Sequence, residues 1–178
     1  MPLVRQGNNC GCGLAAIAMC LRFHGLPVRL RDLEMHRLIR PEFLSRWGIG
    51  PGRIGRTALA FGCPVTIIDP DARDVGKRFV KDGGHWVARE PRKSDISKAL
   101  REGIPAVACI PKKSDAFEGC TQHGSHWITV TGVRGGEFVL HDPAPWRKAT
   151  SCMPGYWDDW GCSLILVHPP RRHPLFER

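Results

Sequence analysis

The sequence predicts a single α+β domain in which N-terminal helices pack on a C-terminal, mainly antiparallel sheet. An Ala- and Leu-rich run over residues 14–24 ends at a glycine, which is typical of a buried helix. Residues 125–142 hold two alternating segments joined by a glycine turn, the pattern of a β-hairpin. The 178 residues, 42% of them hydrophobic, suffice for one core. We assign residues 1–168 to the domain and residues 169–178 to an extended basic tail.

The first half of the chain is expected to be mainly helical. After the buried helix, apolar residues near helical spacing predict a second helix over residues 30–40, whose end Pro41 restricts. The glycine-rich segment 47–53 lacks the lysine and the spacing of a phosphate-binding loop. It is therefore interpreted as a turn that lines the cleft between the helices and the sheet. A short helix over residues 54–61 and a strand over residues 63–69 follow.

The second half carries the hairpin and two further expected strands. Residues 70–93 show no clear pattern and are left unassigned. Ser94 as N-cap and Gly103 as a stop predict a helix between them. The other expected elements are a buried strand over 104–111, a polar loop over 112–124 and a last strand over 162–168.

Cys10 is the strongest candidate for chemistry because it stands directly before the first helix. A helix N-terminus has unpaired backbone N–H groups and the positive end of the dipole, which favour an anion. A thiol at that place ionises more readily and becomes a usable nucleophile. Gly11 and Gly13 are expected to let other backbone approach the sulfur closely.

The predicted hairpin supplies a base for this nucleophile. His126 opens the first strand and Asp142 closes the second, so an antiparallel pairing brings the two side by side. An aspartate at that place accepts a hydrogen bond from the imidazole, selects its tautomer and stabilises the imidazolium. A cysteine on a helix tip, with a histidine and an aspartate on a hairpin, is a papain-type arrangement.

With these motifs in this order, residues 6–143 resemble the bacteriocin-leader-processing cysteine peptidases and their stand-alone relatives. The resemblance implies a papain-like fold and cleavage of a peptide or protein substrate, often after a double glycine. It implies Cys10 as nucleophile, His126 as base and Asp142 as the group that orients the base. We expect no cofactor.

The chain departs from this family at two positions. The family normally has an oxyanion-hole glutamine six residues before the nucleophile, where this chain has Val4. We assign that role to Gln6, with Asn8 or Asn9 as alternatives. The second departure is Cys12, where the family usually has proline or a small residue.

Three other hypotheses use overlapping residues. His85, in a second His-Trp pair, competes for the base role but has no aspartate on a returning strand, and it is interpreted as structural or cleft-lining. Cys10, Cys12, Cys120, His123 and His126 offer ligands for a metal, without the paired Cys-x-x-Cys knuckles of structural zinc sites. A catalytically silent domain of the same fold could bind a peptide or form part of a larger assembly, such as a phage particle.

Composition sets limits on partners and location. The net charge is +9, and residues 1–56 hold nine arginines against three acidic residues. This excess marks either a face for an anionic partner or a solvated, arginine-rich surface, and the second interpretation is favoured. No nucleic-acid-binding motif is recognised, so nucleic acid is not an expected partner. Without an apolar stretch of 18 residues or a signal segment, we expect no membrane span and a cytoplasmic location, or export by a dedicated machine or in a particle.

The eight cysteines are expected to be mostly reduced. Cys20, Cys63 and Cys109 fall in apolar runs, where a free cysteine behaves as a small hydrophobe. Cys152 and Cys162 remain as candidates for a disulfide or a metal site.

Overall fold

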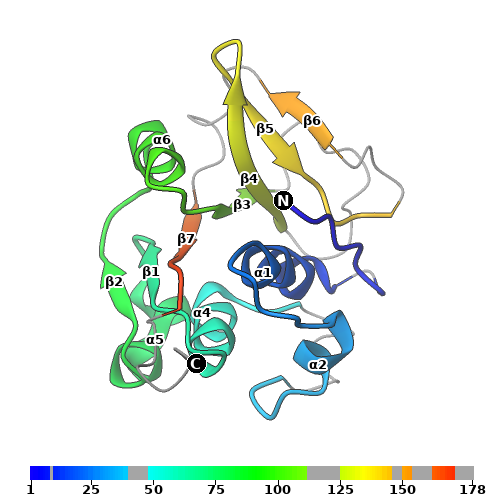
Figure 1. Ribbon diagram of the computed structural model, residues 1–178. Helices are drawn as coiled ribbons and strands as arrows, with labels where there is room; N and C mark the ends of the chain where they lie inside the picture. The colour runs from blue at the N-terminus through cyan, green and yellow to red at the C-terminus, as the bar shows by residue number, and fades with distance from the viewer. Residues whose placement is uncertain (9, 40–47, 112–124, 146–149, 154–161, 171–178) are drawn as a thin grey trace, which may run out of the picture.

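The computed structural model describes residues 1–8, 10–39, 48–111, 125–145, 150–153 and 162–170, and Figure 1 shows their arrangement. The polar loop 112–124 and the tail beyond residue 170 lie outside them. The helices are α1 (Cys12–Phe23), α2 (Leu30–Glu34), α4 (Pro51–Ala60), α5 (Ala72–Lys81) and α6 (Lys93–Arg101). The strands are β1 (Val65–Ile68), β2 (His85–Val87), β3 (Ala106–Pro111), β4 (Ser125–Arg134), β5 (Glu137–His141), β6 (Thr150–Met153) and β7 (Ser163–Val167).

These strands form one seven-stranded sheet in the order β2-β1-β7-β3-β4-β5-β6. Every pairing is antiparallel except that of β1 with β2. The predicted α+β class with a mainly antiparallel sheet is therefore confirmed. The sheet is not purely C-terminal, however, because β7 inserts between β3 and β1 and so joins the strands of both halves. Leu164, Ile165 and Val167 are all buried, as a central strand covered on both faces requires.

Helices cover both faces of the sheet. One buried cluster joins α1, α2, α4 and α5 to side chains such as Val107, Trp127 and Ile165. The second cluster, on the other face, packs Ile96 of α6 against Ile110. In Figure 1, α6 accordingly stands apart from the group formed by α1, α4 and α5.

Helix α1 is the buried helix expected from the alanine-rich run. Its residues from Cys12 to Leu21 are all buried, and the helix lies against β4, where Thr129 Oγ1 donates to Ala16 O at 3.5 Å. A β-carbon added to Gly13 would lie 2.7 Å from Ile54 Cδ1 and 3.2 Å from Trp127 Cδ1. Gly13 therefore allows the start of the helix to pack closely against β4 and α4. We expected backbone to approach at this glycine, but the atoms that do so belong to side chains.

The β4–β5 hairpin also follows the prediction. Gly135 and Gly136 form its turn with φ values of +59° and +84°, a pair of left-handed residues that suits a tight hairpin turn. The register pairs Thr129 with His141, so Asp142, the next residue, lies beside the start of β4. The hairpin, which forms from a local sequence pattern, therefore brings His126 and Asp142 together.

Several boundaries differ from the sequence-based expectation. Helix α2 ends at Glu34, and 74% of the next residue, Met35, is exposed. Ile39 is buried in the core although it lies beyond the end of the helix. Helix α4 begins at Pro51, since proline suits a first helical position. The cap of α6 comes from Asp95, whose carboxylate accepts from Arg92 N at 2.8 Å, and not from Ser94. The unassigned region contains α5 and β2, and β6 was not expected.

Candidate active site

Cys10 lies two residues before the first residue of α1, in a segment held tightly against its neighbours. Only 4% of its surface is exposed, and its backbone N–H donates to Asn8 Oδ1 at 2.9 Å. A β-carbon on Gly48 would lie 3.6 Å from Cys10 O. The glycine-rich segment therefore passes close to the backbone of Cys10, but it is not a turn throughout, because α4 already begins at Pro51.

His126 and Asp142 form a buried pair at the ends of the hairpin strands. His126 Nε2 and Asp142 Oδ1 are 2.8 Å apart, and both side chains are almost wholly buried. The same Oδ1 accepts the backbone N–H of Ala144 at 2.8 Å. Two hydrogen bonds thus direct the carboxylate at the imidazole, as the hairpin pattern predicted.

Gln6 is buried beside the start of α1. Its Nε2 donates to Asn8 O at 2.7 Å, and a β-carbon on Gly11 would lie 3.5 Å from Gln6 Cβ. Gln6 Oε1 is buried, and no donor reaches it from the residues that the structure describes. A buried acceptor without a partner is costly, so the described part of the chain does not fully satisfy this amide.

The segment around Cys10 contacts the residues that directly follow His126 and Asp142. At one end, Gly13 packs against Trp127, the residue after His126. At the other end, Gln6 N donates to Pro143 O, the residue after Asp142, at 2.9 Å. The cysteine loop and the pair therefore belong to one place in the fold, although they are separated by more than a hundred residues in the sequence.

His85 lies elsewhere. It is exposed on β2 at the far edge of the sheet, and β1, β7 and β3 separate β2 from β4. Four strand spacings place it roughly 19 Å from the strand of His126. It neither competes for the base role nor lines this site.

The metal hypothesis receives no support from the part of the chain that the structure describes. No three His, Cys, Asp or Glu side chains are grouped there as ligands. Cys120 and His123, which the hypothesis also requires, lie outside the described residues, as does Asn9.

Two thiols that the sequence did not connect lie together at the ends of β3 and β7. Cys162 Sγ donates to Cys109 O at 3.5 Å. Hydrogen bonding between the thiols lowers the pKa of Cys162 and, with burial, raises the pKa of Cys109. Cys152 lies on β6, four strands from β7 and roughly 19 Å away, which is too far for a disulfide with Cys162. Cys20 and Cys63 are free and buried, as expected.

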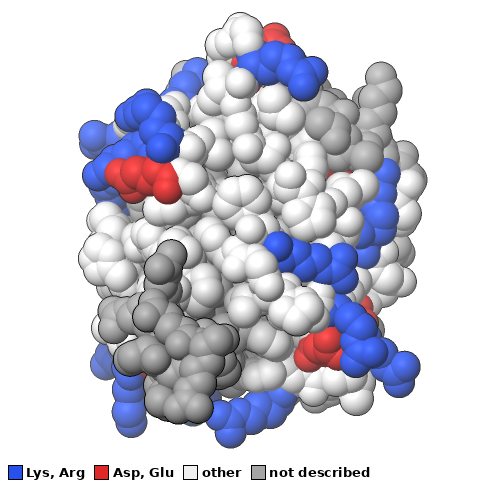
Figure 2. Space-filling view, viewed as in Figure 1, with Lys and Arg blue, Asp and Glu red and all other residues white. Residues whose placement is uncertain are grey.

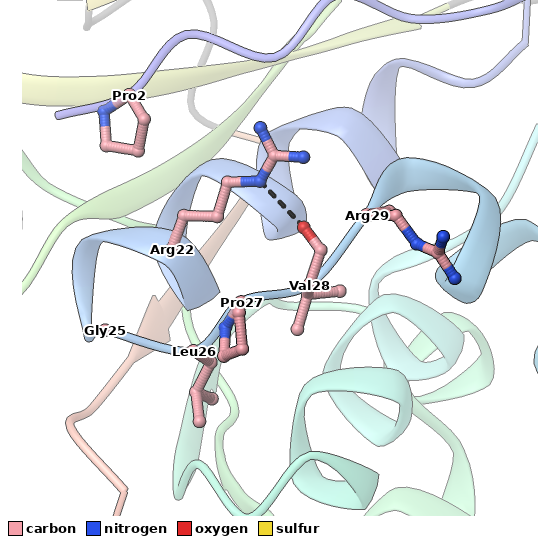
Figure 3. A pocket seen from close by; sticks show the side chains of 7 residues that line it. All are labelled: Pro2, Arg22, Gly25, Leu26, Pro27, Val28 and Arg29. Atoms are coloured by element: carbon pink, nitrogen blue, oxygen red, sulfur yellow. Dashed lines mark hydrogen bonds between the residues drawn. The ribbon is translucent and has the colours of Figure 1, made fainter.

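A pocket of about 420 Å³ lies at the other end of α1 from Cys10 (Figure 3). Arg22 lines it, and its Nε donates to Val28 O at 2.7 Å. Because α1 rises about 1.5 Å per residue, this pocket is roughly 16 Å from the start of the helix and is not part of the candidate site.

Charged side chains do not gather into one patch on the face shown in Figure 2. Lys and Arg residues are scattered over it, most of them toward its edge, and several stand beside acidic residues. Arg29, one of the N-terminal arginines, forms an exposed ion pair with Asp32 at 2.9 Å. An anionic partner therefore gains no support from this face. None of the helices in the described ranges is long and apolar enough to cross a membrane.

A cysteine before a buried helix, with a histidine and an aspartate on a hairpin packed against that helix, defines a papain-like α+β fold. Two solved structures share it. One is a protein from Bacillus anthracis described as a C39-like peptidase, with a TM-score of 0.59, 14% identity and 93% coverage of each chain. The other is the peptidase domain of Streptococcus ComA, a bi-functional ABC transporter involved in a quorum-sensing pathway, with a TM-score of 0.60, 17% identity and coverage of 94% of this chain and 97% of that one.

The model of the Peptidase_C39 like family matches residues 1–161. The chain belongs to this family. No curated protein matches the sequence. Family and fold together support a cysteine-peptidase-like function.

Proposed function

We propose that the protein is a cysteine peptidase that cuts a peptide or amide bond through Cys10, His126 and Asp142. The observation that carries the proposal is the buried 2.8 Å contact between His126 Nε2 and Asp142 Oδ1. The Cys10 segment packs against the residue that follows each of these two side chains. Because Asp142 engages Nε2, the proposal assigns the other ring nitrogen, Nδ1, to the Cys10 thiol.

The chemistry proceeds in two steps. The Cys10 thiolate attacks the carbonyl carbon, and the imidazolium of His126 gives its proton to the departing amine, which leaves a thioester on Cys10. His126 then takes a proton from a water molecule, which attacks the thioester and releases the carboxylic acid. Asp142 keeps the imidazole oriented and stabilises its charged form in both steps.

The proposed oxyanion hole combines the Cys10 N–H with the amide of Gln6. Gln6 Nε2 carries two hydrogens, one of which is directed at Asn8 O, and the proposal assigns the other to the substrate oxygen. In the resting structure, Asn8 Oδ1 accepts the Cys10 N–H that the mechanism requires. Substrate binding therefore has to replace Asn8 Oδ1, the acceptor atom of the Asn8 side chain, at that N–H.

The expected substrate is a peptide or protein with small residues before the cut. Cys10 and His126 are only 4% and 3% exposed, so a substrate backbone has to approach closely to reach the sulfur. Glycine, which lacks a side chain, permits such an approach. This agrees with cleavage after a double glycine, which the resemblance to leader-processing peptidases implies.

A peptide library tests the proposal directly. Wild type is expected to release fragments that the Cys10→Ala variant does not, with mass spectrometry reading the position of the cut. Cys12→Ala is a matched control, because it removes a neighbouring buried thiol and is expected to keep cleavage. Identical products from wild type and Cys10→Ala would contradict the proposal and favour the catalytically silent domain.

A further inference from the structure

Arg5 and Gln6, two adjacent residues near the N-terminus, bind three consecutive carbonyls of the turn that carries Asp142. Arg5 Nη1 donates to Asp142 O at 3.1 Å and also to Ala144 O. Between them, Pro143 O accepts from Gln6 N at 2.9 Å. No sequence pattern singles out Arg5, because a side chain that binds backbone carbonyls needs no particular residue type in its partners.

This turn determines where the Asp142 carboxylate points. Its Oδ1 receives the backbone N–H of Ala144 and His126 Nε2, each at 2.8 Å. Asp142 and Ala144 are 4% and 1% exposed, so water has little access to replace a lost contact. Any change that lets residues 142–144 relax therefore moves the carboxylate relative to the imidazole.

We propose that Arg5 is a positioning residue that holds the 142–144 turn so that Asp142 keeps His126 oriented toward Cys10. This inference rests on the proposed function, because it assigns Arg5 a role in that reaction. Hydrogen bonds from a charged donor are stronger than neutral ones, and one guanidinium nitrogen serves both carbonyls here. The same segment carries Gln6, so the proposed oxyanion donor and the base are held by one short stretch of chain.

Three variants separate the hydrogen bonds of Arg5 from its packing. Arg5→Met keeps most of the aliphatic stem and removes the donors, whereas Arg5→Lys keeps a charged donor on a shorter side chain. Arg22→Met is the matched control, because Arg22 also donates to a backbone carbonyl, that of Val28, but does so beside the distant pocket in Figure 3. All are compared with wild type and His126→Ala.

Two readouts are used, each in a Cys162→Ser background that removes the exposed thiol among the described cysteines. The first is the rate of Cys10 alkylation near pH 6, which reports the thiolate that His126 stabilises. The second is kcat and KM for the best peptide of the library. For Arg5→Met we expect an alkylation rate roughly tenfold lower, in the direction of His126→Ala, and a kcat roughly 10- to 100-fold lower with KM little changed. Arg5→Lys should recover part of both losses, and Arg22→Met should match wild type.

The outcomes distinguish the two proposals. If His126→Ala slows alkylation and Arg5→Met leaves both alkylation and kcat unchanged, the positioning role of Arg5 is wrong while the proposed function stands. If Arg5→Met does not fold, Arg5→Lys decides: a loss in kcat with altered alkylation supports the role, and wild-type values overturn it. If His126→Ala itself alkylates and cleaves like wild type, the proposed function fails, and the inference fails with it.

Discussion

Replacing Asp142 by asparagine separates the charge of its carboxylate from its hydrogen bonds. Asparagine has the same shape, so its Oδ1 can still accept from His126 Nε2 and from Ala144 N, which are both 2.8 Å away in the native protein. The substitution removes the negative charge beside the imidazolium and replaces the second carboxylate oxygen, Oδ2, by an NH2 donor. Alanine at the same position removes both the charge and the acceptor.

The structure sets the expected size of each effect. A hydrogen bond to a charged group contributes about 1.5–3 kcal/mol and a neutral one about 0.5–1.5 kcal/mol. Asp142→Asn therefore loses roughly 1–1.5 kcal/mol, which corresponds to a fall in kcat/KM of about fivefold to tenfold. Asp142→Ala loses the whole interaction, which corresponds to a fall of roughly 10- to 150-fold.

The assay is kcat/KM for the best peptide of the library, with circular dichroism to show that each variant is folded. The near-complete burial of the pair makes these estimates applicable, because water cannot take the place of the lost oxygen. Wild-type activity in both variants would remove Asp142 from the reaction. An asparagine variant as impaired as the alanine variant would refute the separation of charge from geometry.

Three further predictions concern reactivity, the oxyanion hole and stability. Cys10 should be alkylated first, ahead of the exposed Cys162, and the His126→Ala substitution should slow the alkylation of Cys10 alone. Peptide mapping measures both effects. If Cys162 reacts first and the alkylation of Cys10 does not respond to His126→Ala, the assignment is wrong. Gln6→Ala should lower turnover by roughly 10²- to 10³-fold with folding and Cys10 alkylation intact, and unchanged turnover would exclude Gln6 from the site. Burial lowers the pKa of His141 and His168 below 6.5, the value of a histidine in the unfolded chain. As the pH falls, the unfolded chain therefore binds more protons than the folded protein does. The free energy of unfolding should accordingly decrease as the pH is lowered from about 7.5 to about 5.5. Urea titrations measure this fall, and stability that is constant or rising toward acid would show that the sign is wrong.

Much of the candidate site could be predicted from the sequence because its parts carry local signals. The run after Cys10 is alanine-rich and ends at a glycine, which marks a buried helix. The alternation around Gly135 and Gly136 marks a hairpin, and a hairpin necessarily brings His126 and Asp142 to the same end. Both elements form where expected.

Boundaries and caps were predicted less well, because competing local signals are settled by packing. The apolar spacing over residues 30–40 suggested one helix, but α2 ends before Met35, which is exposed. Ser94 and Asp95 both suit the start of α6, and Asp95 supplies the cap. Cys109 and Cys162 are neighbours because β3 and β7 are adjacent in the sheet, and the spacing of the cysteines in the sequence does not reveal that strand order.

The sequence by itself determined the helix before which Cys10 stands and the hairpin that carries His126 and Asp142, because each arises from contacts between residues close in the chain. Only the tertiary structure decided that β7 lies between β1 and β3, that His85 is remote, and that Arg5 binds the turn after β5. Arg5 and Asp142 are 137 positions apart, and the groups that accept from Arg5 are backbone carbonyls. Every residue has a carbonyl, so the partners of Arg5 leave no mark in the sequence, and only the folded chain brings them together.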